Sequence, residues 1–131
     1  MGGPIVVTVP ATAGDGVKTG VTVQSGDVFT VSGSGSAGFG GTRMTYPDGT
    51  TYTDGRYSGA YVPAGLALDG VPAGMLIARI GSGPWLAVGS RQTFQAHQTG
   101  EVTVAYNDKP SAYRDNSGEY SAMVENRGGT R

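Results

Sequence analysis

The sequence lacks cysteine altogether and contains one histidine among its 131 residues. Without cysteine there is no disulfide framework, no thiolate-ligated zinc or iron–sulfur site and no cysteine nucleophile. A single histidine also argues against a metal site built from several histidines. These absences exclude many of the common catalytic and metal-binding arrangements.

Charge and long apolar runs are also scarce. The chain has 9 Lys and Arg against 10 Asp and Glu, and charged residues make up 15% of it. Nucleic-acid binding needs a basic face that neutralises phosphates, so we expect no nucleic-acid partner. No apolar run approaches the ~18 residues of a membrane-spanning helix, so we expect no membrane insertion. Residues 1–5 lack a basic region followed by an apolar stretch, and we expect no signal peptide in this chain.

The chain is instead rich in the residues of β-strands. Apolar and polar residues alternate at 21–24 and 28–31, and β-branched residues dominate 5–9 and 102–106. Such side chains fit a pleated, half-buried surface. No window of ten residues has helical apolar spacing without an interior Gly or Pro, so we expect essentially no helix beyond one turn near 111–114. About eight strands in one domain, residues 1–131, predict an all-β, jelly-roll-like sandwich or a barrel.

Glycine is the other abundant residue, with 24 copies. The run SGSGSAGFGG at 32–41 has the composition of a flexible linker. A linker here would leave two parts too small to build a core, so we predict a long ordered loop with close backbone approach. The run lacks the Gly-Lys-Ser/Thr ending of a phosphate-binding loop.

Two Asp-Gly pairs, at 48–49 and 54–55, flank a short strand-like segment. Asp-Gly tolerates the positive dihedrals of a tight hairpin turn, which predicts an extra hairpin at about 44–60. Four tyrosines crowd this region, and they either line a groove or cover an exposed hairpin; they are Tyr46, Tyr52, Tyr57 and Tyr61.

Nothing in the sequence indicates catalysis. His97 lies where a predicted strand enters a turn, and no nucleophile or orienting partner is recognisable beside it. No carboxylate pair of the kind that glycosidases use stands in a recognisable setting. We therefore expect His97 to be a surface residue and the protein not to be an enzyme.

The segment YNDKPSAYRDNSG at 106–118 concentrates oxygen donors between two predicted strands. Asp108, Asp115 and Asn116 offer side-chain oxygens, and a compact loop adds carbonyl groups. Calcium takes six to eight oxygen ligands in flexible geometry, although the spacing is not that of an EF-hand. The alternative is that these side chains only form the hydrogen bonds of turns.

This segment, continued by Tyr120, Ser121 and Val124, resembles the C-terminal part of the PA-IL (LecA) family of calcium-dependent galactophilic lectins. GDVFTV at 26–31 and LIARIG at 76–81 resemble an early and a central strand of that family. The likeness extends over about residues 20–125 and is closest in the final loop. It implies a jelly-roll-like, galactose-binding-like β-sandwich with calcium at one end.

The resemblance also implies a ligand set for the metal. Phe39 and Ala112 would supply backbone oxygens, and Asp108, Asp115 and Asn116 would supply side-chain oxygens. Two sugar hydroxyls, O3 and O4 of galactose, would complete a seven-coordinate shell, which suits calcium. The family has Asn where this chain has Asp115, and the second carboxylate here matches the charge of the ion.

The sugar-binding positions carried over from the family are Phe39, Tyr61, Asp108, Lys109 and Asp115. Lys109 replaces a small apolar residue. Tyr61 and Ala64 stand where the family has a His and a Gln that contact the sugar, so Tyr61 would contribute its hydroxyl or a stacking face. The extra hairpin at 44–60 would reshape the rim of the site and admit a longer glycan.

From the resemblance we expect a calcium-dependent lectin that binds galactose-containing glycans, acts outside the cell or at a cell surface, and forms a dimer or tetramer. The first alternative is a carbohydrate-binding module from a larger extracellular enzyme. The second is a structural β-sandwich whose loop binds calcium for stability, or binds nothing.

Overall fold

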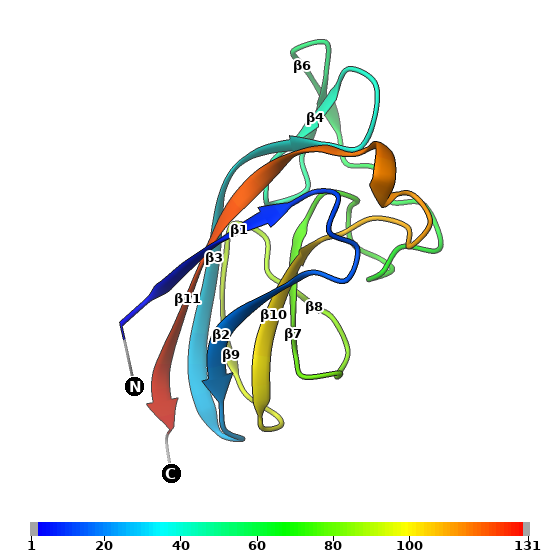
Figure 1. Cartoon of the computed structure of the whole chain (residues 1–131). Helices are drawn as coiled ribbons and strands as arrows, with labels where there is room; N and C mark the ends of the chain where they lie inside the picture. The colour runs from blue at the N-terminus through cyan, green and yellow to red at the C-terminus, as the bar shows by residue number, and fades with distance from the viewer. Residues whose placement is uncertain (1–2, 130–131) are drawn as a thin grey trace.

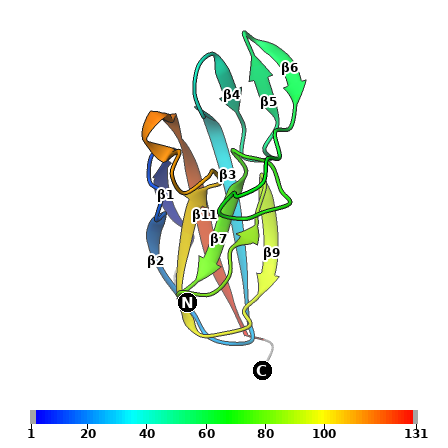
Figure 2. The same cartoon turned by 90° about the vertical axis from the view of Figure 1, so that its right-hand side faces the viewer.

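The computed structural model describes residues 3–129 and consists of two antiparallel β-sheets that face each other (Figures 1 and 2). Residues 1–2, part of the segment considered for a signal peptide, lie outside the described residues. The all-β, jelly-roll-like sandwich expected from the sequence is confirmed. The sheets contain more strands than the eight expected.

The larger sheet has seven strands in the order β1-β11-β3-β4-β5-β6, and β9 also pairs with β3. Its strands are β1 (Ile5–Pro10), β3 (Asp27–Gly38), β4 (Arg43–Thr45), β5 (Thr51–Thr53), β6 (Arg56–Gly59), β9 (Arg91–Gln95) and β11 (Ser117–Gly129). The smaller sheet has the order β2-β10-β7-β8. Its strands are β2 (Val17–Val23), β7 (Leu76–Ile80), β8 (Leu86–Ala87) and β10 (Gly100–Tyr106).

The core lies between the sheets and follows the period-two alternation of the strands. In β10, Val102, Val104 and Tyr106 are fully buried in the core cluster. In β11, Tyr120 and Val124 occupy the same cluster, while the alternate positions along the strand face outward. Burying one face of each strand fixes its register, because a slip of one residue would expose the whole apolar set.

Most of the glycine-rich run is a strand and not the loop that we predicted. Residues 32–38 belong to β3 and pair in continuous register with β11, from Ser32 opposite Met123 to Gly38 opposite Ser117. Glycine is needed at two positions here because atoms of other segments occupy the space that a Cβ would take. A Cβ on Gly33 would lie 2.6 Å from a Leu76 methyl group, and one on Gly38 would lie 2.5 Å from the Arg43 carbonyl oxygen. The close backbone approach was expected correctly, but it occurs within a sheet.

The segment predicted as an extra hairpin folds as a three-stranded meander, β4 to β6, which we call the meander (residues 43–59). It rises beyond the ends of the other strands at the top of Figures 1 and 2. Asp54 and Gly55 both have positive φ, 52° and 79°, as a tight two-residue turn requires. Thr45 attaches the meander to the core, with its Oγ1 2.9 Å from the Tyr106 hydroxyl and 2.8 Å from the Tyr120 hydroxyl.

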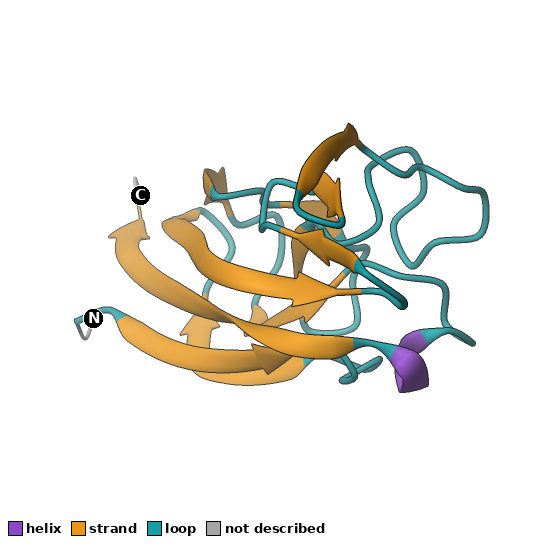
Figure 3. Ribbon diagram, turned by 90° about the horizontal axis from the view of Figure 1, so that it is seen from above, coloured by secondary structure: helices purple, strands orange, loops and turns teal. Residues whose placement is uncertain are grey.

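Between residues 3 and 129, the only helix is one 3-10 turn, Tyr113–Asp115, close to the single turn expected at 111–114. It lies at one end of the sandwich, away from the two chain ends (Figure 3). Within the same residues, no helix is long and apolar enough to cross a membrane.

Candidate functional site

The sheet register brings two segments of the predicted site together at one end of the molecule. Gly38, at the end of β3, pairs with Ser117, at the start of β11. Phe39 is the first residue after β3, and Asn116 is the last residue before β11. The pairing of the two strands therefore places Phe39 and Asn116 at the same end of the sheet. The loop from β10 to β11 carries Asp108 and the 3-10 turn to the same end, at the top of Figure 1.

Asp108 is a buried carboxylate without a cationic partner. Its side chain is 6% exposed, Oδ1 accepts a hydrogen bond of 2.8 Å from the Lys109 amide, and Oδ2 accepts one of 2.8 Å from Asn116 Nδ2. No Lys, Arg or His side chain of residues 3–129 forms an ion pair with it. A buried charge that only neutral groups satisfy is costly, so this position favours a cation.

Asn116 presents a second unsatisfied group beside that carboxylate. Its Nδ2 donates to the Ala11 carbonyl at 2.9 Å and to Asp108 Oδ2 at 2.8 Å. Two acceptors around the nitrogen fix the orientation of the amide, because the oxygen cannot replace a donor. The remaining atom, Oδ1, is buried and has no hydrogen-bond partner. An orphaned buried oxygen of this kind costs ~1–3 kcal/mol and signals a missing donor or ion.

Tyr113, in the 3-10 turn, fixes the backbone of Asp108. Its hydroxyl donates to the Tyr106 carbonyl at 2.7 Å and accepts from the Asp108 amide at 3.2 Å. Burial raises the pKa of Tyr113 to about 12, against the partial opposing effect of its hydrogen bond with the Asp108 backbone. The phenol therefore stays protonated at neutral pH and keeps donating.

Two further predicted ligands, Ala112 and Asp115, lie in the same loop between β10 and β11. Ala112 is half-buried, and its amide donates to the Lys109 carbonyl at 2.9 Å, which closes the loop before the 3-10 turn. Asp115 is exposed and approaches the segment after β3, with its Oδ2 3.7 Å from where a Cβ on Gly40 would stand. Gly40 has a φ of 115°, a conformation that favours glycine.

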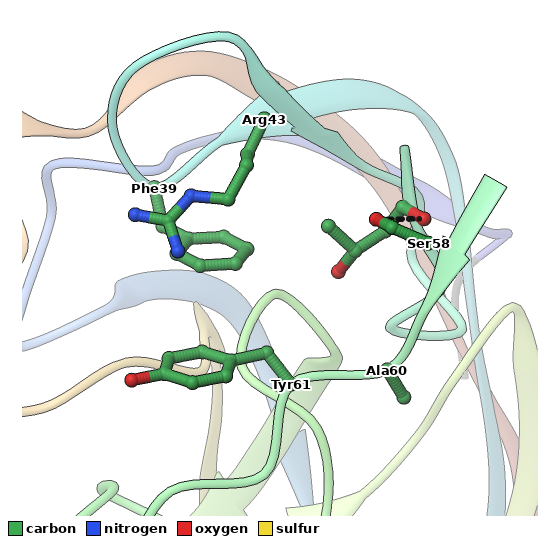
Figure 4. Close-up of a pocket in the computed structure, with 6 residues that line it drawn as sticks. Phe39, Arg43, Ser58, Ala60 and Tyr61 are labelled. Carbon is green, nitrogen blue, oxygen red and sulfur yellow. Dashed lines mark hydrogen bonds between the residues drawn. The ribbon is translucent and has the colours of Figure 1, made fainter. Parts of the chain in front are cut away.

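Phe39 and Tyr61 form the aromatic side of the site. Their rings are parallel within 3° and their centroids are 5.5 Å apart. The Arg43 guanidinium lies 4.5 Å from the centre of the Phe39 ring and 5.9 Å from that of Tyr61 (Figure 4). Ala73, whose amide donates to the Tyr61 carbonyl at 2.8 Å, anchors the backbone there. The four tyrosines therefore form two groups. On the meander, Tyr52 contacts both Tyr46 and Tyr57, whereas Tyr61 stacks on Phe39.

Two other sequence predictions concern residues outside this arrangement. Ala64 lies exposed in the loop after Tyr61, and the structure gives it no polar role. His97 is exposed and lies at the opposite end of β3, where the Ala96 carbonyl accepts a hydrogen bond from the Gly26 amide. His97 is thus far along the sheet from Asp108 and Asn116.

Sequence reasoning missed three contributors to the site. Arg43 gave no signal, because an isolated arginine in a turn-rich segment is usually just a solvated charge. Tyr113 was part of the quoted motif, but only the fold reveals its hydroxyl bridge to Asp108. Asn107, fully buried, holds the loop that follows the meander through its bonds to Leu68 and the Pro72 carbonyl.

The donor set fits a hard cation. No group of three or more His, Cys, Asp or Glu side chains gathers anywhere in residues 3–129, so soft or imidazole-based metal sites have no candidate there. Asp108 and Asn116 instead bring together a carboxylate and an orphaned amide oxygen, both at least nine-tenths buried. Calcium prefers carboxylate, amide and backbone carbonyl oxygens, whereas zinc prefers nitrogen and sulfur.

Comparison with known proteins supports the sequence resemblance. The model of the PA-IL-like protein family matches residues 6–127. A solved structure described as the EclA N-terminal domain, a PllA-like lectin, is similar with a TM-score of 0.70 and 26% sequence identity. That similarity covers 94% of this chain and 96% of the other. The resemblance first seen in the loop at 106–118 is thereby confirmed, and the chain belongs to the PA-IL-like protein family.

Proposed function

We propose that this protein is a calcium-dependent lectin that binds galactose-containing glycans. Its family and its likeness to a PllA-like lectin support carbohydrate binding. The observation that carries the calcium part is the orphaned Oδ1 of Asn116 beside the unpaired carboxylate of Asp108.

Five residues would hold the ion. Phe39 and Ala112 would contribute backbone oxygens, and Asp108, Asp115 and Asn116 would contribute side-chain oxygens. When bound, calcium supplies a positive centre that accepts oxygen ligands, sugar hydroxyls included. The two carboxylates balance its charge, and Tyr113 keeps Asp108 in place through the bridge to its amide.

Selectivity in this proposal comes from geometry. Two neighbouring hydroxyls, O3 and O4 of galactose, would complete the coordination shell, and a sugar with the opposite configuration at C4 would leave one place to water. Tyr61 would offer an aromatic ring to the sugar, and the Lys109 backbone would contact it. A single small polar ligand buries little surface, so we expect a Kd of roughly 0.01–1 mM. A dimer or tetramer of this chain would bind a glycan-covered surface more tightly through avidity.

The test is a calorimetric titration of galactose, once with excess calcium and once with EDTA. We expect binding with calcium, none with EDTA, and at least tenfold weaker binding of glucose, which differs from galactose at C4. Equal binding with EDTA would overturn the role of the metal. If calcium raises the melting temperature but no sugar binds, the site is structural and the lectin proposal is wrong.

A further inference from the structure

A cavity of about 170 Å³ opens beside the proposed calcium site, between the meander and the Phe39–Tyr61 pair. Its lining residues are Phe39, Arg43, Thr51, Ser58, Ala60 and Tyr61 (Figure 4). Drug-sized pockets run from ~300 to 1,000 Å³, so this one suits a single sugar ring or a ring substituent. Three of its six lining residues come from the meander.

Arg43 gives the cavity a positive charge with no acidic partner. Within residues 3–129 the guanidinium takes part in no ion pair and no hydrogen bond, and its contacts are with the Phe39 and Tyr61 rings. Stacking on aromatic rings orients the planar guanidinium while its N–H groups stay available. Arginine of this kind binds a carboxylate or a sulfate in a two-point contact.

Two hydroxyl groups line another part of the cavity. Thr51 is 4% exposed, and its Oγ1 is buried without a hydrogen-bond partner. The Ser58 hydroxyl lies 3.0 Å from Thr53 Oγ1 and donates to the Thr51 carbonyl at 3.1 Å. The unsatisfied hydroxyl of this lining residue is a second, independent observation, because native structures rarely leave such groups without a polar partner.

The charges of the proposed metal site determine which ligands the cavity favours. Asp115 and Arg43 approach the same point, since a Cβ on Gly40 would lie 3.7 Å from Asp115 Oδ2 and 3.9 Å from Arg43 Nη2. If Asp115 and Asp108 bind calcium, the ion cancels their two charges. Arg43 then keeps an uncompensated positive charge at this rim, and it attracts an anion.

We propose that this cavity is a subsite for an anionic substituent, a carboxylate or a sulfate, on the sugar held by calcium. This inference rests on the proposed function. In galactose, the ring carbons next to C3 and C4 are C2, which carries O2, and C5, which carries C6. If O3 and O4 bind the ion, the anionic substituent would therefore be attached at O2 or at C6. Arg43 would bind the anion, the aromatic pair would face the apolar side of the ring, and Thr51 Oγ1 would gain a partner.

The experiment compares neutral and anionic ligands by calorimetry at saturating calcium. The probes are methyl galactoside, methyl galacturonoside, and galactosides sulfated at O6 or at O2. We expect at least one anionic probe to bind about five- to tenfold more tightly than methyl galactoside. The carboxylate and sulfate probes distinguish the two sources of charge. The preference should shrink as salt is raised from 0.05 to 0.5 M, because the contact lies near the surface.

Variants separate this inference from the proposed function. Arg43→Gln should reduce the ratio of anionic to neutral affinity to about one, and this ratio cancels any change that is common to both ligands. Arg56→Gln, an equal charge change at an exposed position of the same meander, should keep the ratio. Thr51→Val removes an unpartnered hydroxyl, so it should weaken binding of the preferred probe without lowering the melting temperature.

Each possible result supports or rejects the subsite, the lectin proposal, or both. If methyl galactoside binds with calcium but no anionic probe binds more tightly, the subsite is wrong and the lectin proposal stands. A preference that survives Arg43→Gln also rejects the subsite. If none of the probes binds, both proposals fail together.

Discussion

Two residues at this end of the molecule combine deep burial with incomplete hydrogen bonding. Asp108 and Asn116 are buried, and their mutual hydrogen bond uses the amide nitrogen while Asn116 Oδ1 stays without a partner. A protein gains nothing in folding from a lone buried carboxylate and an orphaned amide oxygen. In the proposed function, a bound cation would offset this cost.

Replacing Asp108 by Asn tests whether the buried carboxylate binds calcium. The change removes a buried charge and loses at most one hydrogen bond, so stability without calcium should shift by no more than ~1 kcal/mol. Calcium at about 100 times its Kd should stabilise the parent by ~2.7 kcal/mol, roughly 10 °C in melting temperature, and should leave D108N unchanged. Thermal melts with calcium and with EDTA measure both effects.

The matched control is Asp54→Asn, an exposed position in the meander turn whose positive φ Asn tolerates. D54N should keep the full calcium response. A calcium response retained in D108N would show that Asp108 is not a ligand.

Removing the Tyr113 hydroxyl should affect both stability and the ion. Tyr113→Phe leaves the Asp108 amide and the Tyr106 carbonyl without their buried partner, which costs about 1–3 kcal/mol. Because Asp108 also loses a backbone anchor, calcium affinity should fall severalfold. Tyr57→Phe, at an exposed meander tyrosine, should change neither the melting temperature nor the calcium Kd. An unchanged calcium Kd in Y113F would remove Tyr113 from the positioning role.

Among the elements, β3 and the meander show why the glycine-rich run was misjudged. Alternation and branching identify strands that face water on one side. At Gly33 and Gly38, by contrast, there is no room for a side chain. A Leu76 methyl group occupies the position beside Gly33, and the Arg43 carbonyl oxygen occupies the position beside Gly38. Composition cannot distinguish such a strand from a flexible segment. The meander itself followed from the Asp-Gly turns, whose dihedral demands are local.

A methyl group at Gly38 tests this packing. In Gly38→Ala the new Cβ would lie 2.5 Å from the Arg43 carbonyl oxygen, so β3 and the segment leading into β4 must separate. We expect a loss of about 1–3 kcal/mol in unfolding free energy and weaker calcium binding, since Phe39 follows directly. Ser34→Ala, exposed in the same strand, is the control and should be close to neutral. Denaturant melts measure the difference, and equal stability of both variants would contradict the account.

At the scale of the whole molecule, buried tyrosines tie the two sheets and the meander together. Tyr106 in the smaller sheet and Tyr120 in the larger one meet at the Thr45 hydroxyl, and the Tyr120 hydroxyl also donates to the Gly74 carbonyl at 2.7 Å. Burial raises the pKa of both phenols well above the usual value. The phenol groups of Tyr106 and Tyr120 therefore stabilise the sandwich in their protonated, neutral form.

This network predicts how stability depends on pH. The phenol pKa is raised on folding for Tyr106, Tyr113 and Tyr120, so the folded state holds protons that the unfolded chain releases above pH ~10. Stability should be constant with respect to these groups below pH 10 and should fall as pH rises from 10 toward 12. Denaturant melts between pH 8 and 12, with tyrosinate absorbance at 295 nm as a second signal, check this. The chain has seven tyrosines, so a tyrosinate signal from more than four of them before unfolding would contradict it.

The sequence alone determined the all-β class, the turns of the meander, the single helical turn and the oxygen-rich loop with Asp108 and Asn116. Each of these depends on local chemistry, namely alternation, turn dihedrals and donor type. Only the tertiary structure decided that the glycine-rich run is a strand and that Tyr113 holds Asp108. It also decided that Arg43 stacks on Phe39 above a small cavity. These features join residues that are distant in sequence through sheet register and packing, and no local pattern records which distant atoms will occupy the space beside a given residue.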